Sequence, residues 1–284
     1  MKRSSVFLAI LSLAIVIFFS ACDKVKPPFK ESETDNNDTT ATRNFLLEEF
    51  TGHECPNCPQ GAIVAQQLKA LYGNRLILLS IHAGELADPG TGQFALNLEC
   101  PTGNELFTFF QVSAYPTGMV SRSGWSSTQN LAVLDKDSWG ARIESLKNLT
   151  PLISVEISNA YDTTTRTVNS TIECDALQAM SGTYKIAAYL SEDSIVTAQL
   201  TENDPNYPSN IIPDYVDRHV LRGALNSTWG DTLATGNNPK NTQFLKNYSM
   251  VLNSAWNAKH CYVIAFVYDA SNYEIVQVEE KKVR

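Results

Sequence analysis

The chain has 284 residues, of which 43% are hydrophobic and 18% charged, so it has the composition of a soluble globular protein and the length of about two domains. Its formal net charge is −8 at pH 7, and its Lys and Arg residues are not clustered. Because binding to the phosphate backbone of nucleic acids needs clustered Lys and Arg residues, we do not expect nucleic acid as a partner.

The first residues are expected to form a signal peptide, 1–21, rather than part of the fold. Two basic residues precede an almost entirely apolar stretch over 6–19, which is shorter than the roughly 20 residues that span a bilayer comfortably. Residues 19–22 read Phe-Ser-Ala-Cys, which resembles a bacterial lipobox. Cleavage there leaves Cys22 as a lipidated N-terminus that anchors the protein in a membrane. The alternative is an ordinary signal peptide followed by a coincidental cysteine.

The next segment, 22–42, is expected to be a disordered tether. After Pro27 and Pro28 it is a polar run of Glu, Ser, Asp, Asn and Thr, with too little apolar surface to offset its ordering entropy. Such a segment holds a globular body away from the membrane. No acidic cluster directly follows Cys22, so the membrane face, periplasmic or surface, is left open.

Residues 43–149 show the element order of a thioredoxin-like α/β domain. A strand over 45–50 leads into Cys-Pro-Asn-Cys, and an amphipathic helix then ends at Gly73. The run over 76–81 is continuously apolar, as in a strand buried on both faces. Further elements are expected at 105–111 (helix), 115–117 (Tyr-Pro-Thr), 119–120 (strand) and 138–147 (helix). A CxxC beside a βαβ pattern indicates a thioredoxin-like redox motif.

The predicted catalytic residues are Cys55 and Cys58. A cysteine at a helix start lies over unpaired N–H groups and the positive end of the helix dipole, which favours the nucleophilic thiolate. Cys55 would attack a substrate disulfide, and Cys58 would resolve the mixed disulfide. Pro116 resembles the cis-proline of thioredoxins, and with Tyr115 and Thr117 it would form the substrate groove.

Two alternatives to catalysis stay open at this motif. Glu54 precedes the first cysteine, and its carboxylate would raise the thiol pKa, although a protonated His53 could oppose that effect. The CxxC could therefore be an inert structural disulfide. It could also be half of a zinc site completed from His53, His82 and Cys100, although no second CxxC supports a metal and we expect none.

Residues 150–284 are expected to form an antiparallel β-sandwich. Alternation over 153–158 predicts a half-buried strand, and no strong helical stretch follows. The polar, proline-containing stretch 191–217 is expected to be an extended loop. Further strands are expected at 167–174, 183–190, 219–225, 244–252, 261–268 and 273–279.

The other cysteines leave their pairing undecided. Cys174 and Cys261 lie on expected strands and could pair, but free buried cysteine is as reasonable. Cys100 has no obvious partner. We find no Ser-His-Asp spacing, phosphate-cradling glycine loop or calcium loop, and therefore expect no cofactor.

Four motifs resemble the twenty-eight-kilodalton outer-membrane-protein family of Bacteroidetes lipoproteins. They are Leu-Glu-Glu-Phe-Thr-Gly-His-Glu-Cys-Pro-Asn-Cys-Pro at 47–59, Ile-His-Ala-Gly at 81–84, Tyr-Pro-Thr at 115–117 and Arg-His-Val-Leu-Arg-Gly at 218–223. The resemblance runs from about residue 43 to the C-terminus. It implies a thioredoxin-like domain followed by a β-sandwich, anchored to the outer membrane by lipid.

Two functional hypotheses follow. In the first, the protein is a thiol-disulfide oxidoreductase that acts on envelope or extracellular protein clients. In the second, it is a surface or periplasmic binding module of the adhesin type, in which the CxxC is a structural disulfide. Fold alone does not decide between them.

Overall fold

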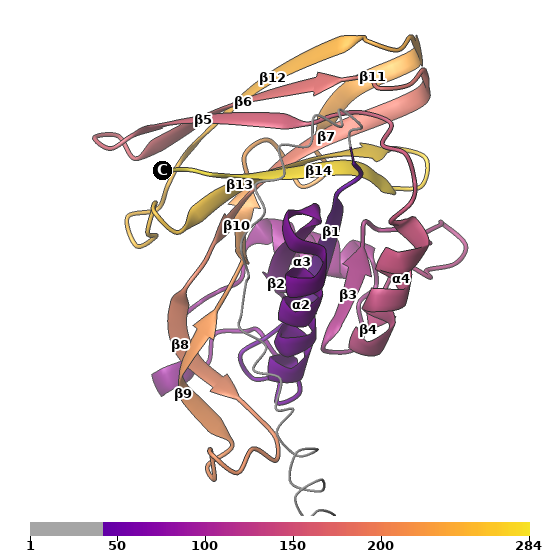
Figure 1. Cartoon of the computed structure of the whole chain (residues 1–284). Coiled ribbons are helices and arrows are strands. Elements are labelled where there is room, and N and C mark those ends of the chain that lie inside the picture. The colour runs from indigo at the N-terminus through magenta and orange to yellow at the C-terminus, as the bar shows by residue number, and fades with distance from the viewer. Residues whose placement is uncertain (1–41) are drawn as a thin grey trace, which may run out of the picture. The chain divides into compact units, whose positions relative to one another are not determined.

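The computed structural model describes residues 42–284, which Figure 1 shows from the indigo strand β1 to the yellow strands at the C-terminus. The expected signal peptide, the expected lipidation site at Cys22 and all but the last residue of the expected tether lie outside the described residues. Within the described part, no helix is both long enough and apolar enough to cross a membrane.

The elements up to residue 146 follow the expected order. Strand β1 pairs in parallel with β2 and antiparallel with β3, and β3 pairs antiparallel with β4, giving the local order β2-β1-β3-β4. In sequence, α2 lies between β1 and β2, α3 lies between β2 and β3, and α4 follows β4. The bounds are β1 (Phe45–Thr51), α2 (Cys58–Tyr72), β2 (Leu76–His82), α3 (Pro101–Phe109), β3 (Thr117–Val120), β4 (Leu134–Asp135) and α4 (Trp139–Leu146).

Strand β1 lies inside the sheet and is buried along its whole length. Because side chains alternate across a strand, Phe45 packs with the residues of α2 and α4, whereas Leu46 packs with those of α3 on the opposite face. The same alternation sends the two consecutive acids of the strand, Glu48 and Glu49, to opposite faces. Both acids are buried, at 0% and 5% exposed.

The remaining elements are all strands. Strands β7, β10, β11, β13 and β14 join the sheet of β1, which thereby becomes a mixed sheet of nine strands, and β12-β6-β5 forms a separate antiparallel sheet. The bounds are β5 (Glu156–Asp162), β6 (Thr167–Asp175), β7 (Met180–Glu192), β8 (Ile195–Leu200), β9 (Ile211–Asp217), β10 (Val220–Ala224), β11 (Asp231–Asn238), β12 (Gln243–Val251), β13 (Cys261–Asp269) and β14 (Ile275–Lys282).

The C-terminal sheets pack face to face over an apolar core. Val168 and Ile172 of β6 share this core with Ile186 of β7 and Val263 of β13. The protein is thus mostly β-structure, with one mixed sheet and smaller antiparallel sheets, an arrangement consistent with a sandwich. In Figure 1 the β5-β6-β12 sheet lies above β13 and β14.

The large sheet continues across residue 150. Val220 of β10 pairs with Ser80 of β2, and β10 also pairs with β7. A second apolar core likewise contains Phe110 at the end of α3 together with Tyr189 and Phe266 from β7 and β13. By their contacts the described residues form one compact unit. A domain boundary between 149 and 150 stays a prediction.

The expectation of an extended loop over 191–217 is wrong. That stretch contains the end of β7 and the two strands of a separate hairpin, β8 and β9. Pro213 in β9 favoured a loop over a strand. In the structure it lies opposite a register shift between Thr197 and Gln199 of β8, where the missing N–H of a proline is tolerated. Strand β11 was also not predicted, because its sequence ends in the polar, turn-like run Thr-Gly-Asn-Asn.

The cysteines outside the CxxC are buried and unpaired in the described part of the chain. Cys174 and Cys261 do not form a disulfide, and burial raises the pKa of each thiol to about 12. Cys100 is the N-cap of α3, where its Sγ accepts a hydrogen bond from the Gly103 N–H at 3.4 Å. These three residues therefore serve packing and capping.

Candidate functional site

The CxxC lies where β1 passes into α2. Cys58 is the first residue of the helix, its N–H donates to the Cys55 carbonyl at 3.2 Å, and the two sulfurs form a disulfide. The expected position of the motif at a helix start is confirmed. However, Cys55 is only 1% exposed and Cys58 only 2%. A partner thiolate therefore has no direct path to either sulfur in this conformation.

The β8–β9 hairpin closes this region. The side-chain amide of buried Gln199 donates from Nε2 to the carbonyls of Cys55 at 2.9 Å, Gly52 at 3.2 Å and its neighbour Leu200 at 3.1 Å. In addition, the Leu200 N–H donates to the His53 carbonyl at 2.8 Å. The hairpin is thus hydrogen-bonded to the backbone of the first cysteine and of two residues that precede it.

Gln199→Ala is expected to lower the free energy of unfolding by about 1–3 kcal/mol, because it leaves buried carbonyls without a donor. It should also speed reduction of the Cys55–Cys58 disulfide by an added phosphine, since the hairpin then opens more often. Gln243→Ala, at an exposed glutamine of β12, is the matched control and should change neither quantity. Equal reduction rates in the two variants would show that Gln199 does not hold the hairpin closed.

His53 does not supply a cation to the cysteines. Its ring is fully buried, stacks on Phe94 at 5.6 Å, and has Nε2 3.1 Å from the Asp88 carbonyl. Burial, and secondarily the nearby His82, lower the pKa of His53, so the ring is neutral at pH 7. Among residues 42–284, no group of three or more His, Cys, Asp or Glu side chains could hold a metal ion.

Of the predicted groove residues, Pro116 lies against the start of α2. The Tyr115–Pro116 bond is cis, and Pro116 packs so close to Gly61 that a Cβ there would meet its ring at 2.7 Å. The Tyr115 hydroxyl donates to the Ala83 carbonyl at 2.7 Å, and the Thr117 hydroxyl donates to that of Ala114 at 2.9 Å. The close approach explains why a glycine is used inside this helix.

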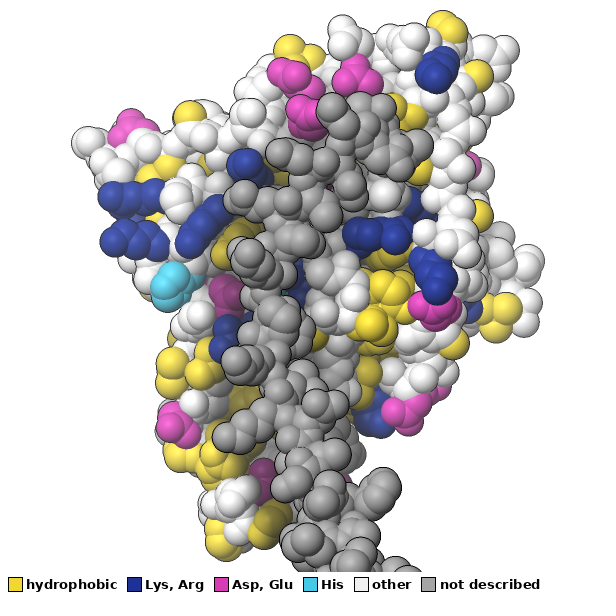
Figure 2. Space-filling model, in the orientation of Figure 1, with side chains coloured by type: hydrophobic (Ala, Val, Ile, Leu, Met, Phe, Trp, Pro, Cys, Tyr) yellow, Lys and Arg dark blue, Asp and Glu magenta, His cyan; other side chains and the backbone are white. Residues whose placement is uncertain are grey.

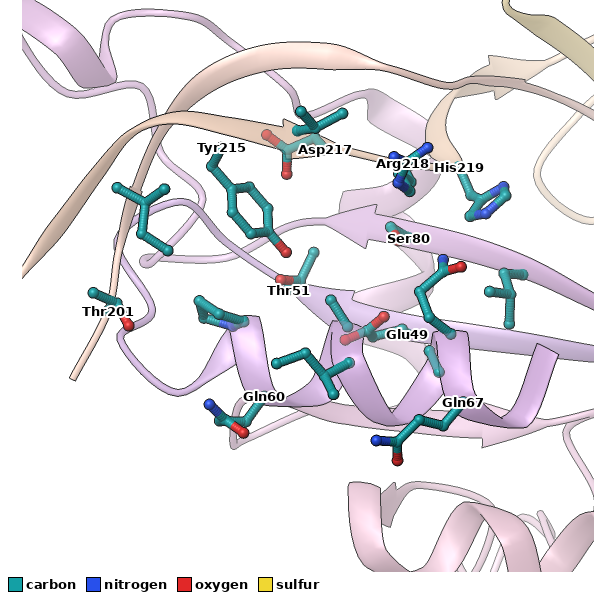
Figure 3. A pocket seen from close by; sticks show the side chains of 18 of the residues that line it. Glu49, Thr51, Gln60, Gln67, Ser80, Thr201, Tyr215, Asp217, Arg218 and His219 are labelled. Carbon is teal, nitrogen blue, oxygen red and sulfur yellow. The ribbon is translucent and has the colours of Figure 1, made fainter. Parts of the chain in front are cut away.

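A pocket of about 610 Å³ opens between α2 and the β8–β9 hairpin, beside the closed disulfide. Figure 3 shows side chains of both elements and of β1 and β2 around it. Its lining includes Glu49 and Thr51 from β1, Leu78, Ser80 and His82 from β2, and Tyr215, Val216 and Asp217 from β9. Pockets of this size that combine apolar walls with a few convergent polar groups are typical of ligand sites.

Strand and helix periodicity build this pocket. The lining residues of β1 and β2 are every second residue, so they share the sheet face that α2 covers. Several of the α2 residues that line the pocket recur at helical spacing, namely Pro59, Ala62, Ile63, Gln66 and Ala70, and Ala65 both lines the pocket and packs into the core. The β8–β9 hairpin lies across the pocket from this face, and the space between them is open to a ligand.

Acidic groups lie at the base of the pocket. Glu49 and Asp217 are each 5% exposed, and Nε2 of buried His82 lies 3.3 Å from Asp217 Oδ1. Burial, with a smaller contribution from the Asp217 charge, raises the pKa of Glu49 to about 8. Burial likewise raises the pKa of Tyr215. Strongly shifted acids in a cleft are typical of functional sites.

Apolar side chains are exposed at the mouth of the pocket and on the hairpin. Ile63 of α2 is 48% exposed and Val216 of β9 is 38% exposed, and both line the pocket. Val196 of β8 is also exposed. Figure 2 shows hydrophobic side chains gathered at the lower left, where Figure 1 places the hairpin. The entrance to the pocket is therefore suited to an apolar or amphiphilic molecule.

The predicted site and the observed pocket are neighbours but not the same place. None of Cys55, Cys58, Tyr115, Pro116 and Thr117 lines the pocket. Sequence reasoning missed the pocket acids and the hairpin residues. One signal was present: two acids stand in the middle of the otherwise apolar strand Phe-Leu-Leu-Glu-Glu-Phe, where burial demands a partner or a shifted pKa.

These features define a β-rich protein with a closed disulfide and an open pocket, and comparison with known protein families identifies its group. The family described as outer membrane protein Omp28 matches residues 104–284, more than half of the chain. The chain therefore belongs to the Omp28 family and is a protein of the outer membrane. The matched segment begins within α3, so it contains Tyr115 and Pro116 but not the CxxC.

Two solved structures share the fold at low sequence identity, and a third is similar over part of the chain. HBP35 of Porphyromonas gingivalis is 17% identical with a TM-score of 0.63, and the match covers 85% of this chain and 76% of that one. AGR_C_4864 from Agrobacterium tumefaciens is 12% identical with a TM-score of 0.53, covering 86% and 96% respectively. A domain of the lipoprotein Omp28 from Porphyromonas gingivalis is 20% identical over 48% of this chain and 91% of that one, with a TM-score of 0.29. No curated protein sequence matches.

Proposed function

We propose that the protein is a binding module of the outer membrane, that the α2–hairpin pocket holds its ligand, and that the Cys55–Cys58 disulfide is structural. The observation that carries this proposal is the contrast between two neighbouring places. The sulfurs are closed under Gln199 and the hairpin, whereas the adjacent pocket of about 610 Å³ is open. In this account the disulfide fixes the start of α2, which forms one wall of the pocket.

The architecture that we propose for this module has three parts. Cys22 carries the lipid anchor, residues 43–149 form a thioredoxin-like domain, and residues 150–284 form a β-sandwich. The thioredoxin-like assignment is supported by the local strand order β2-β1-β3-β4, by the CxxC at the start of α2 and by the packing of Pro116 against Gly61 of that helix. Thioredoxin-like domains can serve as binding scaffolds, so this assignment is compatible with a binding role.

A second candidate function is thiol-disulfide exchange with envelope proteins. It is favoured by the packing of Pro116 and of the Glu49 carboxyl against Gly61 in the first turn of α2, because a carboxyl with a pKa of about 8 can exchange protons near neutral pH. Exchange also requires the hairpin to release Cys55, since only an accessible thiolate attacks a disulfide.

The binding proposal is tested by filling the pocket. The neutral apolar dye Nile red is expected to bind the full chain and to lose about tenfold or more in affinity in Ala62→Trp, whose indole occupies the pocket. Fluorescence titration measures the affinity. The matched control is Ala141→Trp, at an exposed position on α4, which should bind the dye as the unchanged protein does. Equal affinity in Ala62→Trp and the control would refute the pocket as the binding site.

A further inference from the structure

The base of the pocket contains acceptor atoms that the protein leaves without donors. Glu49 Oε1 and Asp217 Oδ2 are buried, and neither has a hydrogen-bond partner within the described residues. Both side chains line the pocket, and Figure 3 shows them on its two sides, Glu49 from β1 and Asp217 from β9. A buried acceptor without a donor lowers the free energy of unfolding, so such atoms are rare in folded proteins and often mark a place where a ligand supplies the donor.

The Arg and His side chains around the pocket do not donate to these two oxygens. His82 Nε2 lies 3.3 Å from Oδ1 of Asp217, the other oxygen, and makes no hydrogen bond there. Arg218 also lines the pocket, but its guanidinium lies 3.4 Å from the carboxylate of Asp193, which is not a lining residue. His219, at the rim, lies 3.9 Å from the same Asp193. The acidic end of the pocket therefore retains acceptors for donors supplied from outside.

The path from the pocket mouth to these acceptors is lined mainly by aliphatic groups. Ala62, Ile63 and Ala65 of α2 face Ile212 and Val216 of the hairpin across the pocket. A ligand that matches both regions needs an apolar stem and, at its end, a group that donates several hydrogen bonds. Primary ammonium groups donate three hydrogen bonds and guanidinium groups five. A cation bound beside Glu49 also favours the ionised form of that carboxyl, whose pKa burial otherwise raises to about 8, so the hydrogen bonds gain from opposite charge.

We propose that the pocket binds molecules carrying a primary ammonium or guanidinium group at the end of an unbranched apolar stem, with Glu49 and Asp217 as the acceptors for that group. This inference rests on the proposed binding function and specifies its ligand class. The group can belong to a free amine or to a Lys or Arg side chain of another protein. A carboxylate at the same end would be repelled, and an alcohol supplies a single donor.

The test compares three probes of equal stem length, hexylammonium, hexanol and hexanoate, by calorimetric titration of the full chain. Hexylammonium is expected to bind about tenfold more tightly than hexanol, and hexanoate more weakly than both. Glu49→Gln and Asp217→Asn should each abolish most of the preference for the ammonium without changing the affinity for hexanol. Nα-acetyl-lysine amide is titrated in parallel to identify the source of the ammonium group. Binding at least as tight as that of hexylammonium indicates a Lys side chain of another protein, and weaker binding indicates a free amine.

The matched control is Asp214→Asn, on the same strand as Asp217 but exposed and outside the pocket lining, which should leave the preference intact. Equal affinities for hexylammonium and hexanol, or a preference that survives both Glu49→Gln and Asp217→Asn, would overturn the inference. If none of the three probes binds while Nile red still binds, the inference about the ligand class is wrong and the proposed binding function stands. If Nile red also fails to bind, both fall.

Discussion

Arg122→Met is expected to lower the free energy of unfolding by about 3–5 kcal/mol, because it leaves a buried carboxylate without its partner. Arg122 and Glu48 are both 0% exposed and are joined by two hydrogen bonds, Nε to Oε2 at 2.8 Å and NH2 to Oε1 at 2.6 Å. The guanidinium also lies over the rings of Phe110 and Phe266, at 5.3 and 5.0 Å. Chemical denaturation with a two-state fit measures the loss.

The same ion pair connects the N-terminal elements to the C-terminal strands. Glu48 lies on β1, Arg122 follows β3, and the ring of Phe266 belongs to β13. The double variant Glu48→Met/Arg122→Met should recover most of the lost stability, since it removes both charges together. The control Lys136→Met breaks the exposed pair with Asp137 and should cost less than about 1 kcal/mol. A loss in Arg122→Met as small as in this control would contradict the account.

The stability of the protein is expected to fall by about 4 kcal/mol between pH 4.5 and pH 8 through Glu49 alone. The unfolded chain releases the Glu49 proton near pH 4.5, whereas the folded protein, with a pKa of about 8, retains it. The folded state therefore binds more protons throughout this window, and raising the pH favours unfolding. The contribution is fully present well below pH 4.5, and its loss is complete about one pH unit above 8.

Glu49→Gln should remove this pH dependence. The variant is expected to unfold at higher denaturant concentration than the unchanged protein at pH 8, and the difference should shrink toward pH 5. Burial also raises the pKa of Glu99 and Glu279, so only the difference between variant and unchanged protein isolates Glu49. Glu173→Gln, at an exposed position of β6, is the control. Parallel stability curves for Glu49→Gln and the unchanged protein would exclude a neutral buried Glu49.

The early elements could be predicted from sequence because their signals are local. The apolar run of β2 and the Cys-Pro-Asn-Cys at the start of α2 depend on neighbouring residues, and the structure confirms both. The β8–β9 hairpin depends on distant partners. Its strands pair only with each other, so their sequence lacks the apolar pattern of a core strand, and Pro213 points to a loop.

The pocket was beyond sequence reasoning for a related reason. Glu49 and Asp217 are far apart in the chain, and they meet at one pocket only because the hairpin folds back over α2. The hydrogen bond from Gln199 to the Cys55 carbonyl likewise joins residues far apart in the chain, and the glutamine gives no local indication that it will contact the motif. A CxxC predicts where cysteines lie along a helix, but not what covers them.

The most direct test of whether this protein is a binding module or a thiol-disulfide exchange protein is the reduction potential of the Cys55–Cys58 pair. It is measured on the full chain by thiol alkylation across a series of redox buffers. Because both sulfurs are buried under the hairpin, we expect a potential below about −300 mV, where structural disulfides lie. A potential between about −120 and −270 mV, the span of exchange proteins, would contradict the structural role and make thiol-disulfide exchange the better account.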